Sequence, residues 1–245
     1  MKTSARRPDI LLCGDDELGY RASRTRFAAG EGFALDESYR LAHLPLVAPL
    51  HSKVIARRPG TTYEMGRHDK TVSLVLPVPD VDHLIEAELR AQPFADKIAW
   101  DIVPRRRGKL HATLCGAPVV LDAAARQALA GIGPIGVELR GLFSGTVNHG
   151  RLYLRVYPEK RAGGNPLAYV QRLLGRRETG LYLVGLHNLV DDLDARETAA
   201  LAALLERWWE RPILRWQADA LWLLAAWDDL VLTGAVEERI SLSAG

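Results

Sequence analysis

The sequence is poor in cysteine, in long apolar runs and in net charge, and each shortage excludes a class of protein. Cys13 and Cys115 are its only cysteines, too few for the disulfide framework of a small secreted domain, so we expect a reducing, cytoplasmic location. No apolar run approaches the roughly 18 residues of a membrane helix. Acidic residues 15–17 interrupt the apolar piece near the start, so we expect no leader segment and no membrane partner. The formal net charge of +2 gives no overall attraction to nucleic acid, and any such affinity has to come from a local patch.

Apolar residues make up 48% of the 245-residue chain, which is enough to build a large core. Residues 1–70 have weak periodicity, many charges and scattered glycine and proline. They predict an N-terminal extension of unknown role, with one short helix near residues 37–44. Residues 71–245 carry regular apolar patterns and predict a folded domain of the α+β class.

The order of the expected elements follows from apolar spacing, because strands alternate with a period of two and helices with a period of 3.6. Asp122 is the expected N-cap of one helix, and Asp194 with Glu197 forms a capping-box pattern ahead of another. Strands are expected at 71–78, 98–104, 108–116, 135–143, 151–158 and 180–190, and the segments 213–229 and 230–242 are expected to form a closing hairpin that turns at 227–229. Helices are expected at 81–92, 121–133, 165–177 and 194–209.

This order of elements repeats along the chain. A strand with a histidine, a helix and a hairpin follow one another over residues 110–157, and again over residues 181–242. His111 and His187 hold equivalent positions in the two units. The repeat predicts two similar lobes, built from antiparallel sheets with flanking helices, in which the two histidine strands meet and the imidazoles face each other.

The first histidine strand combines two groups that suit phosphate chemistry. His111 and Thr113 are two residues apart, so in a strand both side chains point to the same face. Of two imidazoles beside a phosphodiester, one can act as a general base that takes a proton from the attacking oxygen, and the other as a general acid that gives a proton to the leaving oxygen. A hydroxyl donor stabilises the negative charge on a nonbridging phosphate oxygen. This chemistry requires no metal and no cofactor.

The motif His111-Ala112-Thr113, the later strand histidine His187, and the helix and hairpins that follow them resemble the 2H phosphoesterase superfamily. The resemblance covers about residues 70–245 and rests on element order more than on identity. It implies a duplicated, bilobal α+β fold and metal-independent hydrolysis or formation of cyclic phosphates and 2′,5′ linkages. It also implies that the two histidines are the acid/base pair and that Thr113 binds phosphate.

The second motif departs from the family pattern. It reads His187-Asn188-Leu189, with leucine where the family has serine or threonine. Leucine donates no hydrogen bond, so either Asn188, Tyr182 or a basic side chain supplies the missing donor, or the second half of the site is weakened. Loss of one such donor costs on the order of a hundredfold in rate.

Other candidates for substrate binding have simpler structural explanations beside the functional one. Arg107 belongs to the basic run 105–107, which lines a phosphate site or is a solvated loop. Lys109 shares the face of His111 and is the favoured basic residue. Tyr153 stacks on a base or belongs to the core. His111 and Cys115 lack a second ligand pair at useful spacing, so no metal site is expected.

The sequence therefore predicts a metal-independent phosphodiesterase that acts on a cyclic phosphate or a 2′,5′-type linkage of a nucleotide or RNA end. His111 and His187 would be the catalytic pair, and which of them is the base stays open. The alternative is a catalytically weakened nucleotide- or RNA-binding protein of the same fold. A scaffold with no phosphate ligand remains a third possibility, and the oligomeric state is open.

Overall fold

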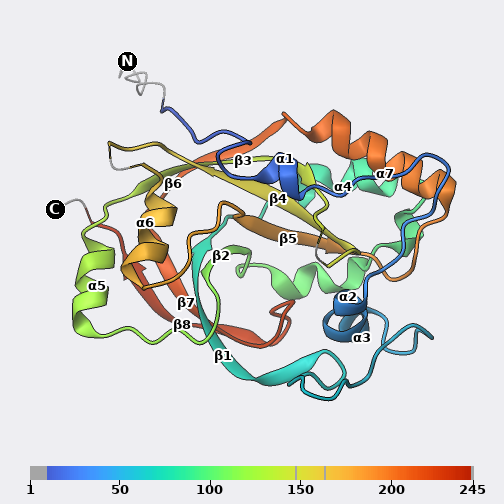
Figure 1. Cartoon of the computed structure of the whole chain (residues 1–245), viewed down its shortest axis with the longest axis horizontal. Helices are drawn as coiled ribbons and strands as arrows, with labels where there is room; N and C mark the ends of the chain where they lie inside the picture. The colour runs from blue at the N-terminus through green and yellow to red at the C-terminus, as the bar shows by residue number, and fades with distance from the viewer. Residues whose placement is uncertain (1–9, 147, 163, 244–245) are drawn as a thin grey trace.

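The protein, described here by a computed structural model, is of the α+β class (Figure 1). The structure describes residues 10–146, 148–162 and 164–243. The described residues form one eight-stranded antiparallel sheet in the order β6-β3-β4-β5-β2-β1-β7-β8. The strands are β1 (Arg67–Pro77), β2 (His111–Cys115), β3 (Ile135–Phe143), β4 (Arg151–Pro158), β5 (Leu183–Asn188), β6 (Pro212–Ala218), β7 (Ala220–Asp228) and β8 (Gly234–Ser241).

The helices begin where the sequence supplies caps. The Asp122 carboxylate accepts from the backbone of Ala125 at 2.7 Å at the start of α5, and Asp194 and Glu197 form the expected capping box of α7. The α-helices are α1 (Tyr20–Ser23), α2 (Glu37–Ala42), α3 (Leu44–Val47), α4 (His83–Arg90), α5 (Ala123–Ala130), α6 (Pro166–Leu173) and α7 (Ala195–Trp208), and the short 3₁₀ turns are η1 (Ala95–Lys97), η2 (Trp100–Ile102) and η3 (Pro104–Arg106).

The two histidine strands meet at the centre of the sheet, as the repeat predicts. β2 pairs with β5 through Ala112 and Val184, and four strands lie on each side of this junction. The β3–β4 hairpin, which follows β2 in sequence, pairs with β5. The β7–β8 hairpin, which follows β5, pairs with β1, and β1 in turn pairs with β2. Each histidine strand therefore lies on the side of the sheet that carries the hairpin of the other unit.

Two of the expected strands are wrong. Residues 98–104 form η2 and the beginning of η3 instead of a strand, and the indole Nε1 of Trp100 donates to the carbonyl of Ala95 at 2.8 Å. A short apolar run does not distinguish a strand from a buried turn. Residues 213–229 form two strands, because β6 ends before Asp219 and pairs with β3, whereas β7 pairs with β1.

The two faces of the central strands differ in packing. The main apolar core joins sheet residues to helices α4, α5, α6 and α7, and Leu74 and Leu114 belong to it. Val75 and Thr113 pair across β1 and β2 on the other face. On the part of this face formed by β1 and β7, the described residues Val75, Leu224 and Val231 form a small separate cluster. This second face carries the candidate site.

Residues 10–66 pack against the sheet and add no strand to it. The blue N-terminal segment crosses in front of β3 and β4 in Figure 1. Tyr20 Oη donates to the backbone carbonyls of Val156 and Tyr182 at 2.7 and 3.0 Å. The predicted helix near residues 37–44 is confirmed as α2. Residues 1–9 of the predicted extension lie outside the described residues, and the domain boundary at residue 70 stays a prediction.

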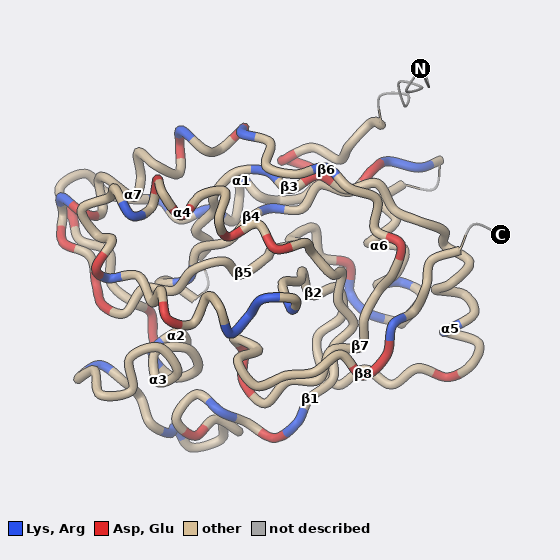
Figure 2. Tube along the Cα trace, turned by 180° about the vertical axis from the view of Figure 1, so that it is seen from behind, with Lys and Arg blue, Asp and Glu red and all other residues tan. Residues whose placement is uncertain are grey.

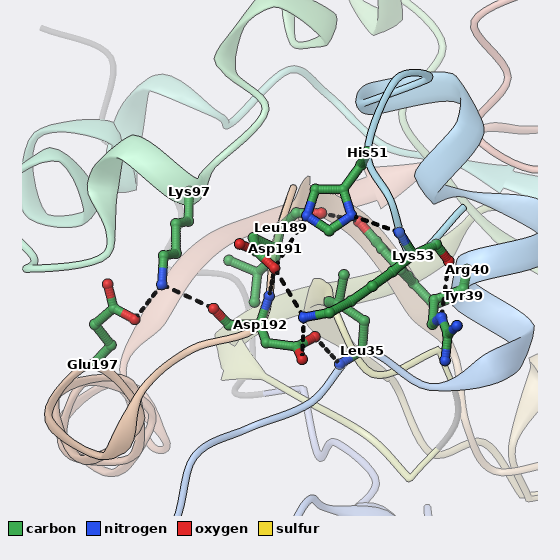
Figure 3. A network of polar contacts seen from close by, with 10 residues as sticks. All are labelled: Leu35, Tyr39, Arg40, His51, Lys53, Lys97, Leu189, Asp191, Asp192 and Glu197. Atoms are coloured by element: carbon green, nitrogen blue, oxygen red, sulfur yellow. Dashed lines mark hydrogen bonds and ion pairs between the residues drawn. The ribbon is translucent and has the colours of Figure 1, made fainter. Parts of the chain in front are cut away.

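The loop after β5 is held by basic residues from two distant parts of the chain (Figure 3). Lys53 Nζ lies 2.6 Å from the carboxylate of Asp192, and Lys97 Nζ donates to the backbone carbonyl of Asp192 at 2.9 Å. Tyr39 Oη donates to the carbonyl of Leu189 at 2.5 Å. These contacts fix the end of β5, where the second motif lies.

Candidate functional site

His111 and Thr113 lie together on the less covered face of the sheet. Thr113 is exposed and His111 is partly exposed, whereas Ala112 between them is buried. The pairing of Ala112 with Val184 places Gly185 opposite His111 on the same face. Glycine has no side chain, so the position facing the imidazole across the junction is filled from elsewhere.

Arg151 fills this position. A Cβ atom on Gly185 would overlap the guanidinium of Arg151, so that group lies directly over the glycine. The same guanidinium lies 5.4 Å from the ring of Tyr153, and its Nη1 donates to the carbonyl of Asp229 at 3.3 Å. A permanent positive charge therefore stands beside His111.

A second arginine lies where β2 and β5 diverge. Arg106 is 4% exposed, and its guanidinium donates to the backbone carbonyls of Gly185 and Leu186. Its charge has no carboxylate partner within ion-pair distance among the described residues. Burial lowers the pKa of Arg106 to about 9, and the charge of Arg151 acts in the same direction. An arginine buried without an anion favours an anionic ligand nearby.

The imidazole of His111 is neutral at pH 7. Burial of the ring lowers its pKa to about 4, opposed by the backbone contact to Lys109 and reinforced by Arg151 and Arg106. Nδ1 lies 2.8 Å from the carbonyl oxygen of Lys109. A carbonyl only accepts, so Nδ1 carries the proton and Nε2 holds the free lone pair.

His187 lies on the opposite face of the sheet. Tyr153 pairs with Gly185, but the next pair along β4 is Leu152 with His187. β5 thus has one extra residue, Leu186, at a β-bulge, and the bulge reverses the faces of the residues after it. The structure therefore does not bring the two imidazoles to a common groove, contrary to the expectation that they face each other.

The surroundings of His187 are apolar. The side chain is 1% exposed, and its ring packs edge-on against Trp100 with centroids 5.2 Å apart. Neither ring nitrogen has a hydrogen-bond partner among the described residues. Burial lowers the pKa of His187 to about 3, with smaller contributions from Arg106 and Arg90. The role of His187 as an acid or base stays a prediction without geometric support.

Comparison with protein-family models and with curated proteins gives no match. Among solved structures, the chain is similar to the protein TT0787 of Thermus thermophilus, with 15% identity. The similarity covers 71% of this chain and 98% of that one, with a TM-score of 0.36. A likeness this weak carries no argument about function.

Of the remaining predicted binding residues, Asn188 lies at the site and the side chain of Lys109 points away from it. Asn188 pairs with Arg151 and is fully buried on the His111 face, and neither atom of its amide has a partner among the described residues. Lys109 points elsewhere, since its Nζ donates to the carbonyl of Val231 at 2.9 Å. Lys109 therefore fixes the β7–β8 turn.

Tyr153 and Arg107 match the structural alternatives that the sequence left open, a core position for Tyr153 and a solvated loop for Arg107. Tyr153 is 8% exposed, so its ring is packed rather than available as a stacking surface. Arg107 is exposed on the turn before β2, where the backbone of Gly108 donates to the carboxylate of Asp80 at 3.0 Å. Figure 2 shows the basic run leading into β2 near the middle of the molecule.

The β7–β8 turn closes one side of the site through Asp229. Tyr63 Oη donates to the Asp229 carboxylate at 2.5 Å, and the Nε2 atoms of His68 and His43 lie 3.5 and 3.8 Å from it. Tyr63 and His68 flank the start of β1, and His43 lies at the α2–α3 junction. The N-terminal segment thus contributes one wall beside Arg151.

Arg151 was not expected at the site, although the sequence pattern around it indicates its position. The alternation of residues 151–157 places Arg151 and Tyr153 on one face, in the strand that leads toward the second motif. The assembled site offers guanidinium groups, a neutral imidazole and a hydroxyl, which suits a phosphate ligand. Across the described ranges, no group of three or more His, Cys, Asp or Glu is arranged to hold a metal ion. No helix within these ranges is long and apolar enough to cross a membrane.

Proposed function

We propose that the surface around His111 binds the phosphate group of a nucleotide or an RNA end, in a cytoplasmic protein with a 2H-like fold. The main observation in support of this proposal is that His111, Thr113 and the guanidinium of Arg151 share one accessible face of the sheet. The Thr113 hydroxyl donates a hydrogen bond to a nonbridging phosphate oxygen, and the guanidinium of Arg151 balances the negative charge of the phosphate. His187 takes no part in this proposal because it lies behind the sheet.

Hydrolysis of a cyclic phosphate or a 2′,5′-type linkage is the second candidate. It is favoured by the tautomer of His111, whose Nε2 is free to take a proton from an attacking hydroxyl or water. In this version a water molecule, and not His187, gives the proton to the leaving oxygen. A pKa of about 4 makes His111 a weak base, which is why binding is the first proposal.

Binding of adenosine 2′,3′-cyclic phosphate, measured by calorimetry with EDTA present, tests the proposal. Thr113→Val and Arg151→Met are each expected to weaken binding about 10- to 100-fold, because each removes a hydrogen bond to a charged group. Thr71→Val, the same change elsewhere on the sheet in β1, is the matched control and is expected to leave affinity unchanged. His187→Leu is also expected to bind normally.

Turnover is followed in the same samples. Product formation that is lost in His111→Ala and kept in His187→Leu would establish the second candidate. Loss of turnover in both variants would restore the two-histidine mechanism and contradict our placement of His187 outside the site. Affinity that is equal in all variants would refute the proposal.

A further inference from the structure

We infer that a cavity at the start of β7, lined by Trp216 and Trp222, binds the base of the nucleotide whose phosphate lies beside His111. This inference rests on the proposed function and specifies its ligand as a nucleoside phosphate. The cavity has a volume of about 340 Å³, at the lower end of the range of roughly 300–1,000 Å³ found for small-molecule sites.

Strand register places Trp222, on one wall of the cavity, on the same face as His111 and Thr113, whereas Trp216 pairs with Val137 and packs against the main core. Val75 of β1 pairs with Thr113 of β2 on one side and with Trp222 of β7 on the other. Directly paired residues point to the same face, so these three side chains form one row. Strands lie about 4.8 Å apart, so Trp222 is roughly 10 Å from Thr113. That separation suits the two ends of one nucleotide.

The next row of paired side chains on this face, two residues farther along β1, connects the cavity to the imidazole of His111. Pro77 of β1 pairs with His111, and Pro77 also lines the cavity. Ala220 at the first position of β7 lines it too, and its small side chain leaves room beside the proline. The cavity and the face that carries His111 therefore share a border across β1.

The lining has the chemistry of a base-binding site. Indole rings offer flat, polarisable faces on which any nucleobase can stack. Gln217 is exposed at the rim, and its amide both donates and accepts, as the edge of a base requires. Asp219 accepts from Arg239 at 3.0 Å and completes the polar rim.

The packing of Trp222 leaves part of its ring free. Trp222 is partly exposed and packs against the small cluster that contains Val75 and Leu224. That cluster is separate from the main core, and none of its described members belongs to a helix. The partly exposed ring of Trp222, at an open cavity on the face of His111, is thus available to a ligand.

The test compares adenosine 2′,3′-cyclic phosphate with ribose 2′,3′-cyclic phosphate, which lacks the base. Stacking predicts that the nucleotide binds more tightly than the base-free probe, by on the order of tenfold. Trp222→Leu is expected to abolish this difference and to leave affinity for the base-free probe unchanged. Trp222→Phe is expected to retain most of the difference. Trp227→Leu is the matched control, since Trp227 lies in the same strand, is 37% exposed and does not line the cavity.

Gln217→Ala provides a test that does not disturb packing. Its side chain is exposed, so the variant is expected to fold normally and to change the ratio of affinities for adenosine and uridine 2′,3′-cyclic phosphates. An unchanged ratio, together with a Trp222→Leu variant that keeps the nucleotide advantage, would overturn the base site. If the base-free probe binds neither the unaltered protein nor any variant, the proposed function fails instead.

Discussion

Replacing Asp15 by alanine is expected to lower the free energy of unfolding by about 3–5 kcal/mol, because it leaves a buried charge without its partner. Arg155 is fully buried in β4, and its Nη1 lies 3.1 Å from the carboxylate of Asp15. Tyr157 Oη and the indole of Trp209 also donate to this carboxylate. One substitution therefore removes the acceptor of three buried donors.

Asp16→Ala is the matched control for this prediction. The Asp16 side chain is 90% exposed and has only a distant contact with Arg21, so its removal is expected to change stability by less than about 0.5 kcal/mol. Both variants are compared by urea unfolding. If Asp15→Ala is no more destabilising than Asp16→Ala, the N-terminal segment is not part of the cooperative fold.

Lowering the pH from 7 to 5 is expected to reduce the free energy of unfolding by about 2 kcal/mol through each of His111 and His187, and further through His43, whose pKa burial holds well below its usual value. Burial holds the folded-state pKa values of His111 and His187 at about 4 and about 3. In the unfolded chain all of these imidazoles take a proton near pH 6.5. The unfolded state therefore binds more protons below pH 6.5, and stability is lost as the pH falls toward the folded values.

His187→Leu isolates the contribution of His187 to this pH dependence. The variant is expected to lose about 2 kcal/mol less than the unaltered protein between pH 7 and pH 5, as measured by urea unfolding at each pH. At pH 7 it is expected to be at least as stable, because two unpaired buried nitrogens are removed. His83→Leu, on the exposed face of α4, is expected to keep the full pH dependence. Identical pH profiles for all three proteins would show that His187 is not buried.

Most of the fold could be predicted because its signals are local. Helix caps such as Asp122 and Asp194 depend on residues three or four positions away, and both capped helices are confirmed. Alternation in the β3–β4 hairpin was equally clear, and this pairing is confirmed. The segment 98–104 failed because its apolar residues carry no period that separates a strand from a turn.

The site could be predicted only in part because its other half depends on contacts across strands. The shared face of His111 and Thr113 follows from a period of two within one strand. The bulge at Leu186 has no signature in GLYLVGLHNLV, and it determines on which side His187 lies. The position of Arg151 over Gly185 requires the register between β4 and β5, which no local pattern supplies.

The bulge at Leu186 also bears on how this face of the sheet could acquire a different chemistry. A strand whose register slips by one residue presents the following side chains on its other face. If β5 paired regularly and Leu186 lay opposite Leu152, His187 would pair with Arg151 and turn to the side of His111. One irregularity of register in β5 therefore decides whether this face carries one imidazole or two.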